Sequence, residues 1–247
     1  YKRQVFKEFI DRDFLDALNC DLEEAKRFYE ENEVGFGKML DLSCGKGAEI
    51  IKMSDFADAK EFYDYIKEKG FGVIEEYLIN HDKIREVYEP ALNTMRMLTI
   101  IGDDKKPHLF FAAQKFGVNG RFIDVHGIHA PIDLETGVIH FPFHSGNTDT
   151  DLIYSKHPDT GFDLTNYEVP MFKEAKEMIL KAAMLVPEMR YVGWDVAITN
   201  KGPKIVEGND YTAYDYMQLP DQNPGRIGVI PDILKLVPSF KDELYKS

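Results

Sequence analysis

The sequence has few cysteines and fewer basic than acidic side chains, and each shortage excludes a class of protein. Two cysteines in 247 residues do not make the disulfide framework of a small secreted domain. A formal net charge of -13 argues against general affinity for nucleic acid or anionic lipid, which need surplus positive charge. No apolar run reaches the roughly 20 residues of a membrane span, and no signal-peptide pattern opens the chain. We therefore expect a cytoplasmic protein without nucleic-acid partners or a membrane span.

Several catalytic motifs are also missing. The seven histidines are scattered without the spacing of a zinc site, and no serine or cysteine nucleophile motif occurs. No GxxxxGK[ST] loop occurs either, so a P-loop is excluded. The chain opens at Tyr1 rather than at methionine, and we expect a trimmed or abbreviated N-terminal part. The 44% of hydrophobic residues suffice for the core of one large domain or of two small intertwined ones.

The sequence does contain alternating helical and strand patterns. Apolar residues at helical spacing predict helices over 2–18, 21–31, 55–69 and 172–185, with Asp21 as an N-cap and Gly70 as a C-cap. Alternating or continuous apolar runs predict strands over 34–42, 48–53, 72–79, 93–101, 108–116, 122–125, 137–143, 191–199 and 204–207. This mixture predicts an α+β fold with mostly antiparallel strands and helices on one face.

Two acidic residues interrupt a pair of apolar strands late in the sequence. A tight turn at Lys201-Gly202 would place Asp195 and Glu207 nearly opposite one another. Carboxylates side by side in a buried sheet repel and are costly to desolvate, and a divalent cation removes both costs. Asn209 points to the same face as Glu207, so the three residues offer the oxygen ligands that Mg²⁺ prefers. The alternative is a hairpin whose acids pair with lysine or arginine.

Other charges lie where nucleotide contacts are expected. Lys38 interrupts an apolar strand and is suited to an α-phosphate, although a lysine on a solvated face is the alternative. Arg96, in another apolar strand, is suited to a γ-phosphate or a substrate carboxylate, and its alternative is a structural ion pair. Gly45, Lys46 and Gly47 form a turn whose backbone N–H groups suit a phosphate, as any glycine-rich hairpin turn would.

Glu75 and Glu76 end an apolar strand. A glutamate and backbone groups at this position would meet the edge of an adenine ring, whereas paired glutamates are ordinarily a solvated strand end.

In chain order these features resemble the ATP-grasp superfamily, and three stretches are similar to its sugar-transfer-associated branch, which is related to proteins of polysaccharide-peptide biosynthesis. The stretches are Asn93-Thr94-Met95-Arg96, His157-Pro158-Asp159-Thr160-Gly161, and Gly193-Trp194-Asp195 through to Glu207-Gly208-Asn209. The resemblance runs from about Phe6 to the end of the chain. It implies two α+β subdomains, 1–80 and 81–247, whose mostly antiparallel sheets grip ATP, with the metal-binding hairpin in the second.

The resemblance also implies a role for each candidate residue. Lys38 would contact the α-phosphate, and Arg96 would face the γ-phosphate. The glycine turn would form a lid over the β- and γ-phosphates, with Lys46 and Arg96 as the catalytic cations. The remaining nucleotide contacts would come from Glu75, Glu76 and Leu78 at adenine and from Asp82 at the ribose, and the metal would be held by Asp195, Glu207 and Asn209.

The implied activity is that of an ADP-forming ligase. ATP and Mg²⁺, with Mn²⁺ as an alternative ion, would activate a carboxylate as an acyl phosphate, which an amine then displaces. The acceptor would be a small molecule or a saccharide-like or peptide-like compound, and Arg121, Asp124, His126 and His129 are candidates for its pocket. The alternatives are an ATP-dependent phosphotransferase on the same fold and a non-catalytic nucleotide-binding module. The sequence says nothing of the oligomeric state.

Overall fold

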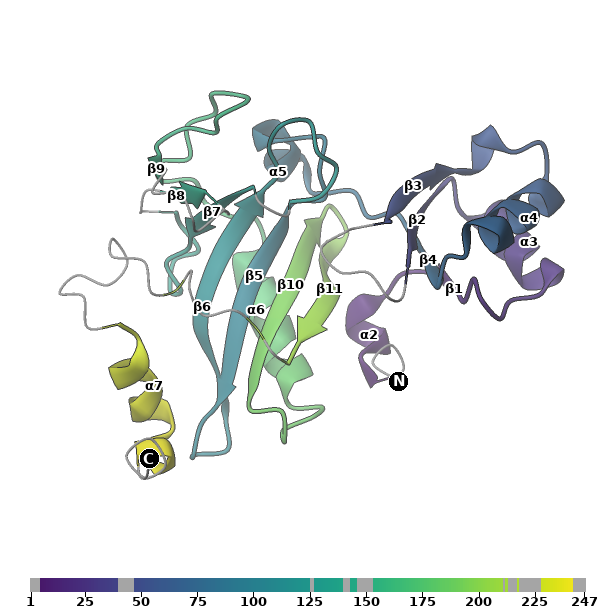
Figure 1. Cartoon of the computed structure of the whole chain (residues 1–247). Helices are drawn as coiled ribbons and strands as arrows, with labels where there is room; N and C mark the ends of the chain where they lie inside the picture. The colour runs from purple at the N-terminus through teal and green to yellow at the C-terminus, as the bar shows by residue number, and fades with distance from the viewer. Residues whose placement is uncertain are drawn as a thin grey trace. The chain divides into compact units, whose positions relative to one another are not determined.

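The backbone of this computed structural model is described for residues 5–39, 47–124, 127–139, 143–145, 153–210, 212, 217 and 228–241 (Figure 1). It divides into two compact units. One unit is Asp11–Ile79, and the other combines the residues up to Ile10 with those from Asn80 onward. The division of the sequence into subdomains 1–80 and 81–247 stays a proposal, because residues 5–10 group here with the second part of the chain.

The unit Asp11–Ile79 is built on a four-stranded antiparallel sheet. Its strands lie in the order β1 (Phe14–Leu15), β4 (Val73–Glu76), β2 (Val34–Lys38) and β3 (Glu49–Lys52), and a short 3-10 turn, η1 (Met53–Asp55), follows β3. Helices α3 (Leu22–Glu31) and α4 (Ala59–Lys69) complete the unit. Apolar side chains from both helices and from the sheet form one buried core, whose largest members are Phe28, Phe62, Ile66, Phe71 and Ile74.

Local capping explains where these two helices begin and end. α3 confirms the helix expected at 21–31, and Asp21 and Glu24 form a capping box with N–H···O distances of 2.9 and 3.0 Å. α4 begins at Ala59 rather than at residue 55, because the Asp58 carboxylate accepts the backbone N–H groups of the first turn. It ends, as expected, at Gly70, whose φ of 73° is a left-handed conformation that glycine adopts without strain.

The prediction of a helix over residues 2–18 is wrong beyond Ile10. Among residues 5–18, helix α2 covers only Lys7–Ile10, and Asp11 then turns the chain with a φ of 36°. Phe14 and Leu15 pair as β1 with Glu75 and Ile74 of β4. Pairing with the edge of a sheet has therefore overridden the helical spacing of the apolar residues.

The second unit contains a seven-stranded antiparallel sheet. Its order is β11 (Gly202–Asn209), β10 (Tyr191–Thr199), β5 (Thr94–Ile101), β6 (Pro107–Phe116), β7 (Ile128–Pro131), β8 (Phe143–Ser145) and β9 (Ile153–Tyr154). The strands expected at 93–101, 108–116, 191–199 and 204–207 are confirmed. In the described parts of 122–125 and 137–143, only isolated bridges at Ile123, Val138 and Ile139 and the first residue of β8 take strand pairing.

One face of this sheet packs on helix α6 (Phe172–Ala183), as Figure 1 shows. The inward positions expected from the sequence, Ala175, Ile179, Ala182 and Ala183, are all buried there. The unit also contains α5 (Asp82–Val87), α7 (Ile230–Leu236) and η3 (Pro238–Phe240). None of the helices in the described ranges is long and apolar enough to cross a bilayer. Because strand side chains alternate, the residues between the core positions point to the other face, where the candidate site lies.

Candidate active site

Asp195 and Glu207 are paired across the β10–β11 hairpin, as expected, but by a different route. The turn lies at Asn200-Lys201, and Thr199 pairs with Gly202. Continued regularly, this register would set Asp195 opposite Val206. Instead the register shifts between Asp195 and Val196 of β10. Val206 is therefore an additional residue of β11 without a register partner in β10, and Glu207 becomes the partner of Asp195. This β-bulge puts Glu207 on the face of Asp195, opposite to the core.

The Asp195 carboxylate is buried, with 8% of the residue exposed, and two cations neutralise it. Arg96 on β5 binds it with a two-pronged fork, Nε to Oδ1 at 2.9 Å and Nη2 to Oδ2 at 3.0 Å. Lys115 on β6 places its Nζ 3.0 Å from Oδ1. Burial by itself raises the pKa of Asp195, but Lys115 and Arg96 outweigh it and hold this pKa below the ordinary value.

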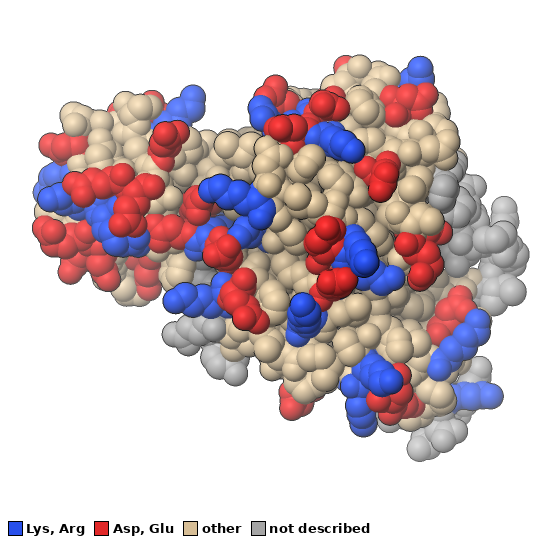
Figure 2. Space-filling model, turned by 180° about the vertical axis from the view of Figure 1, so that it is seen from behind, with Lys and Arg blue, Asp and Glu red and all other residues tan. Residues whose placement is uncertain are grey.

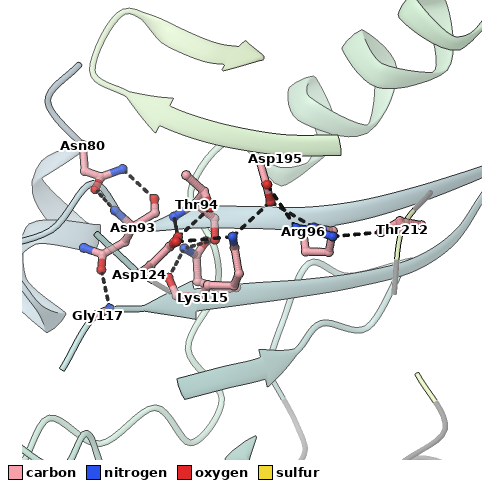
Figure 3. Close-up of polar contacts among 10 residues, drawn as sticks. Asn80, Asn93, Thr94, Arg96, Lys115, Gly117, Asp124, Asp195 and Thr212 are labelled. Carbon is pink, nitrogen blue, oxygen red and sulfur yellow. Dashed lines mark hydrogen bonds and ion pairs between the residues drawn. The ribbon is translucent and has the colours of Figure 1, made fainter. Parts of the chain in front are cut away.

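Lys115 belongs to a second buried ion pair. Its Nζ lies 3.3 Å from Oδ1 of Asp124, and only 9% of the lysine side chain is exposed. The other oxygen of Asp124 accepts the backbone N–H and the hydroxyl of Thr94, at 2.7 and 2.6 Å. Burial by itself lowers the pKa of Lys115, but the carboxylates of Asp124 and Asp195 raise this pKa by more than burial lowers it. The lysine therefore stays charged. Figure 3 shows the resulting chain of contacts from Thr94 through Asp124 and Lys115 to Asp195 and Arg96.

Gly193 gives this cluster its last member. A Cβ atom on Gly193 would lie 2.3 Å from Oγ1 of Thr212, which is too close for any side chain. The absence of a side chain lets Thr212 lie against β10, where its Oγ1 accepts a hydrogen bond of 2.8 Å from Nη1 of Arg96 (Figure 3). The guanidinium is therefore fixed by Thr212 as well as by Asp195. Burial by itself lowers the pKa of Arg96. The surrounding carboxylates, including Glu207, outweigh burial and raise this pKa above its ordinary value.

The three expected metal ligands share one end of the hairpin. Glu207 is exposed, in contrast to the buried pair of carboxylates expected from the sequence, and Asn209 is half-buried on the same face. Of the donors that the structure describes around Asp195, only Nη2 of Arg96 reaches Oδ2. The set thus fits a cation that would share Asp195 with Arg96 and be reached from solvent at Glu207. No group of three or more His, Cys, Asp or Glu side chains that could hold a metal occurs in the described ranges, and the expected set has two carboxylates and one amide.

The expected nucleotide residues of the unit Asp11–Ile79 also meet. Glu75, with 3% of its side chain exposed, forms an ion pair with Lys38, whose side chain is 32% exposed. Its other oxygen accepts two hydrogen bonds from Arg12, which the sequence reasoning missed. Glu76 accepts a backbone N–H at 3.2 Å, and Leu78 is half-buried.

The residue expected at the ribose and the glycine turn expected over the phosphates have different outcomes. Asp82 begins α5 with its side chain 67% exposed, and its Oδ1 accepts an N–H from Asn200 at 3.1 Å, which ties it to the hairpin turn. Gly47 is exposed with a φ of 69° and precedes β3, whereas Gly45 and Lys46 lie outside the described residues, as does His126. On the face shown in Figure 2, the described Lys and Arg side chains are interspersed with Asp and Glu.

Comparison with known proteins decides the family. Residues 51–226 match the family described as sugar-transfer associated ATP-grasp. The chain belongs to this ATP-grasp family. Members of the ATP-grasp family are ATP-dependent carboxylate–amine ligases. No curated protein matches the sequence significantly.

Solved structures share the ATP-grasp fold of this chain at low sequence identity. A D-alanine–D-alanine ligase from Coxiella burnetii matches with a TM-score of 0.51 and 10% identity, over 99% of this chain and 58% of its own. The biotin carboxylase domain of a 2-oxoglutarate carboxylase from Hydrogenobacter thermophilus, solved with ADP, magnesium and bicarbonate, matches with a TM-score of 0.50 and 14% identity, over 87% and 39%. The chain therefore spans less than two thirds of the length of either protein.

Proposed function

We propose that this ATP-grasp chain catalyses an ATP- and Mg²⁺-dependent ligation of a carboxylate to an amine. The observation that carries the proposal is the polar sheet face, where a carboxylate pair on a bulged hairpin adjoins the buried Lys115 and the half-buried Arg96. An oxygen of the substrate carboxylate attacks the γ-phosphorus of ATP, and the bond from that phosphorus to the bridging oxygen of ADP breaks. The amine nitrogen then attacks the acyl phosphate, loses a proton and releases inorganic phosphate. The acceptor class is saccharide-like or peptide-like.

In this assignment the sheet face holds the reacting end of the nucleotide. Asp195, Glu207 and Asn209 hold Mg²⁺, which when bound neutralises charge on the phosphates. Arg96 and Lys115 are the cations directed at the γ-phosphate, and their buried carboxylate partners keep them charged and fixed in place.

The remaining contacts with ATP are assigned to the residues that the sequence singled out. Lys38 binds the α-phosphate side, and Lys46 with its flanking glycines covers the β- and γ-phosphates. Adenine is held by Glu75, Glu76 and Leu78, and the ribose by Asp82.

This chemistry does not require the protein to form a covalent bond with the substrate. Phosphoryl transfer and attack on an acyl phosphate depend on positioning and charge neutralisation, which cations held by more than one partner provide. Arg96 is fixed by three hydrogen bonds to Asp195 and Thr212, and Lys115 by two carboxylates. The absence of a nucleophile–base motif from the sequence agrees with a mechanism that needs none.

The test uses hydroxylamine in place of the unknown amine. The chain is incubated with ATP, Mg²⁺, hydroxylamine and pools of sugar acids, amino acids and short peptides, and ADP and hydroxamates are measured. The proposal expects a hydroxamate that depends on both ATP and one acid, together with ADP and phosphate. ADP with a stable phosphorylated acid or alcohol, and no hydroxamate, would identify a phosphotransferase instead. Nucleotide binding without ADP formation across all pools would contradict an enzymatic role.

A further inference from the structure

Asp124 is a buried carboxylate beside the polar sheet face, and both of its oxygens have partners within the chain. Only 6% of the residue is exposed. Its Oδ2 accepts the backbone N–H and the hydroxyl of Thr94 at 2.7 and 2.6 Å, and its Oδ1 lies 3.3 Å from Nζ of Lys115. Asp124 is therefore held by the first residue of β5, and its charge is paired with that of Lys115.

The backbone around Asp124 fixes this position. Leu92, shortly before β5, donates its N–H to the Phe122 carbonyl at 3.2 Å. Gly127 donates its N–H to the Asp124 carbonyl at 3.1 Å, and a Cβ atom on Gly127 would lie only 1.8 Å from the Phe116 carbonyl oxygen. Only glycine fits so close to another backbone. The chain between β6 and β7 therefore returns to β5 at one defined place, which delivers the Asp124 carboxylate to Lys115.

Two cations share the carboxylate of Asp195. The Arg96 fork uses both of its oxygens, and Nζ of Lys115 lies 3.0 Å from Oδ1. Without a further acid, the charges of these two cations would cancel those of Asp195 and Glu207, and a site without net charge has little attraction for a divalent cation. With Asp124 included, the five side chains sum to a charge of −1. Asp124 therefore balances the charge that Lys115 brings to Asp195.

We propose that Asp124 is a positioning residue for the divalent cation at the β10–β11 hairpin, which it does not itself touch. It acts through Lys115. As the second carboxylate on that ammonium, it leaves Asp195 with charge to share between Arg96 and the metal. The ligand class is a hard divalent cation, Mg²⁺ or Mn²⁺, that takes oxygen ligands. This inference rests on the proposed function, since it deepens the account of the same metal site.

The test measures Mn²⁺ binding to the full chain by electron paramagnetic resonance, with and without ADP. Asp124→Asn keeps the shape of the side chain and should weaken Mn²⁺ binding about tenfold, because the metal then competes with Lys115 for Asp195. The double variant Asp124→Asn/Lys115→Met removes both members of the ion pair, which is less costly to the fold than removing one. It leaves the charge of the site as in wild type, so its Mn²⁺ affinity should lie within about threefold of wild type.

Two controls locate the effect. Asp103→Asn removes an acid of the same unit that is paired with Arg190 at 2.9 Å and follows the other end of β5, so it lowers the negative charge of the chain but not of the site. Its Mn²⁺ affinity should equal that of wild type. Glu207→Gln should weaken binding, because Mn²⁺ bound elsewhere on this acidic chain would not respond to it. Urea unfolding followed by the buried Trp194 identifies any variant that has lost the fold.

Recovery in the double variant separates this role from damage to the fold, because a second buried substitution would add to structural damage rather than repair it. Wild-type Mn²⁺ affinity in Asp124→Asn, or an equal loss in the single and double variants, would overturn the inference. If Asp124→Asn does not fold, the double variant decides alone, since weakened binding there would mean that Asp124 acts on the metal without Lys115. Absence of Mn²⁺ binding in wild type, or binding that does not respond to Glu207→Gln, contradicts the metal site of the proposed function instead.

Discussion

Replacing Lys115 by methionine tests whether the polar sheet face is held together by buried charges. Methionine keeps most of the length of the side chain but removes the ammonium that lies 3.0 Å from Asp195 and 3.3 Å from Asp124. At an effective dielectric constant of about 20, each of these contacts corresponds to about 5 kcal/mol of gross attraction before desolvation is subtracted. Removing one partner of a buried pair has a net cost of about 3–5 kcal/mol, because the remaining charge is left uncompensated.

Protonation of a carboxylate limits the loss of stability in Lys115→Met and makes this loss depend on pH. For an aspartate with an ordinary pKa of 3.8, taking up a proton costs about 4 kcal/mol at pH 7 and about 1.6 kcal/mol at pH 5. In wild type the pKa of Asp195 is lowered, so its stabilisation is present above pH 3.8 and is lost only as pH falls through the folded-state value. In Lys115→Met, Asp195 keeps Arg96 but loses the ammonium, so burial raises its pKa relative to wild type. Acidification then relieves the variant while wild type keeps its stability. The difference in unfolding free energy should therefore narrow by about 2–3 kcal/mol from pH 7 to pH 5.

The assay is urea unfolding followed by the fluorescence of Trp194. This residue is the only tryptophan of the chain and is 2% exposed in the core of the same unit, so its signal reports the unit that contains Lys115. The control Lys235→Met removes a surface pair with Asp232, whose side chains are 75% and 56% exposed, and should change stability by less than about 1 kcal/mol at either pH. A loss below about 1 kcal/mol at pH 7, or a difference that does not depend on pH, would refute the reasoning.

Two further predictions concern residues around this face. Gly193→Ala should destabilise the unit by about 1–3 kcal/mol and lower ADP formation, because the new Cβ displaces Thr212 from Arg96; unchanged urea unfolding and activity would contradict the role given to Gly193. Burial lowers the pKa of His157, whose Nε2–H donates to the Gly117 carbonyl and whose Nδ1 accepts backbone N–H groups. Because the folded-state pKa of His157 lies below 6.5, the free energy of unfolding should fall as pH drops from about 6.5 through the folded-state pKa. His157→Gln should remove this part of the pH dependence in the urea assay followed by Trp194. An equal dependence of the unfolding free energy on pH in both proteins would exclude His157 as its source.

The sequence predicts the four long strands of the second sheet, β5, β6, β10 and β11, because their apolar patterns are long enough to be recognised although charged residues interrupt them. It also indicates the opposition of Asp195 and Glu207, but it does not reveal the bulge at Val206 that produces this pairing. A bulge leaves no mark on an apolar strand, since the extra residue is itself apolar. The exposure of Glu207 follows from the position of β11 at the edge of the sheet, which depends on the order of the strands in space.

The residues that the sequence reasoning missed differ in whether a signal was present. Lys115 interrupts an apolar strand in the same way as Arg96, so the rule that found one applies equally to the other. Thr212 lies outside the predicted elements and Arg12 lies within the helix wrongly expected over 2–18, and only the fold brings them to Arg96 and Glu75. Their roles were therefore not predictable from spacing. The helix expected over residues 2–18 failed for a related reason, because pairing with β4 is a contact distant in sequence.

Magnesium dependence of ADP formation in Glu207→Gln tests the central claim most directly. Glu207 is exposed, so its replacement leaves Arg96 and Lys115 with their partners, which Asp195→Asn does not. The control Asp210→Asn removes another exposed acid at the end of the same hairpin. The account predicts that Glu207→Gln unfolds in urea like wild type but loses ADP and hydroxamate formation at Mg²⁺ concentrations that saturate both wild type and the control. Normal turnover and an unchanged Mg²⁺ requirement in Glu207→Gln would contradict the assignment of Asp195, Glu207 and Asn209 as the metal site.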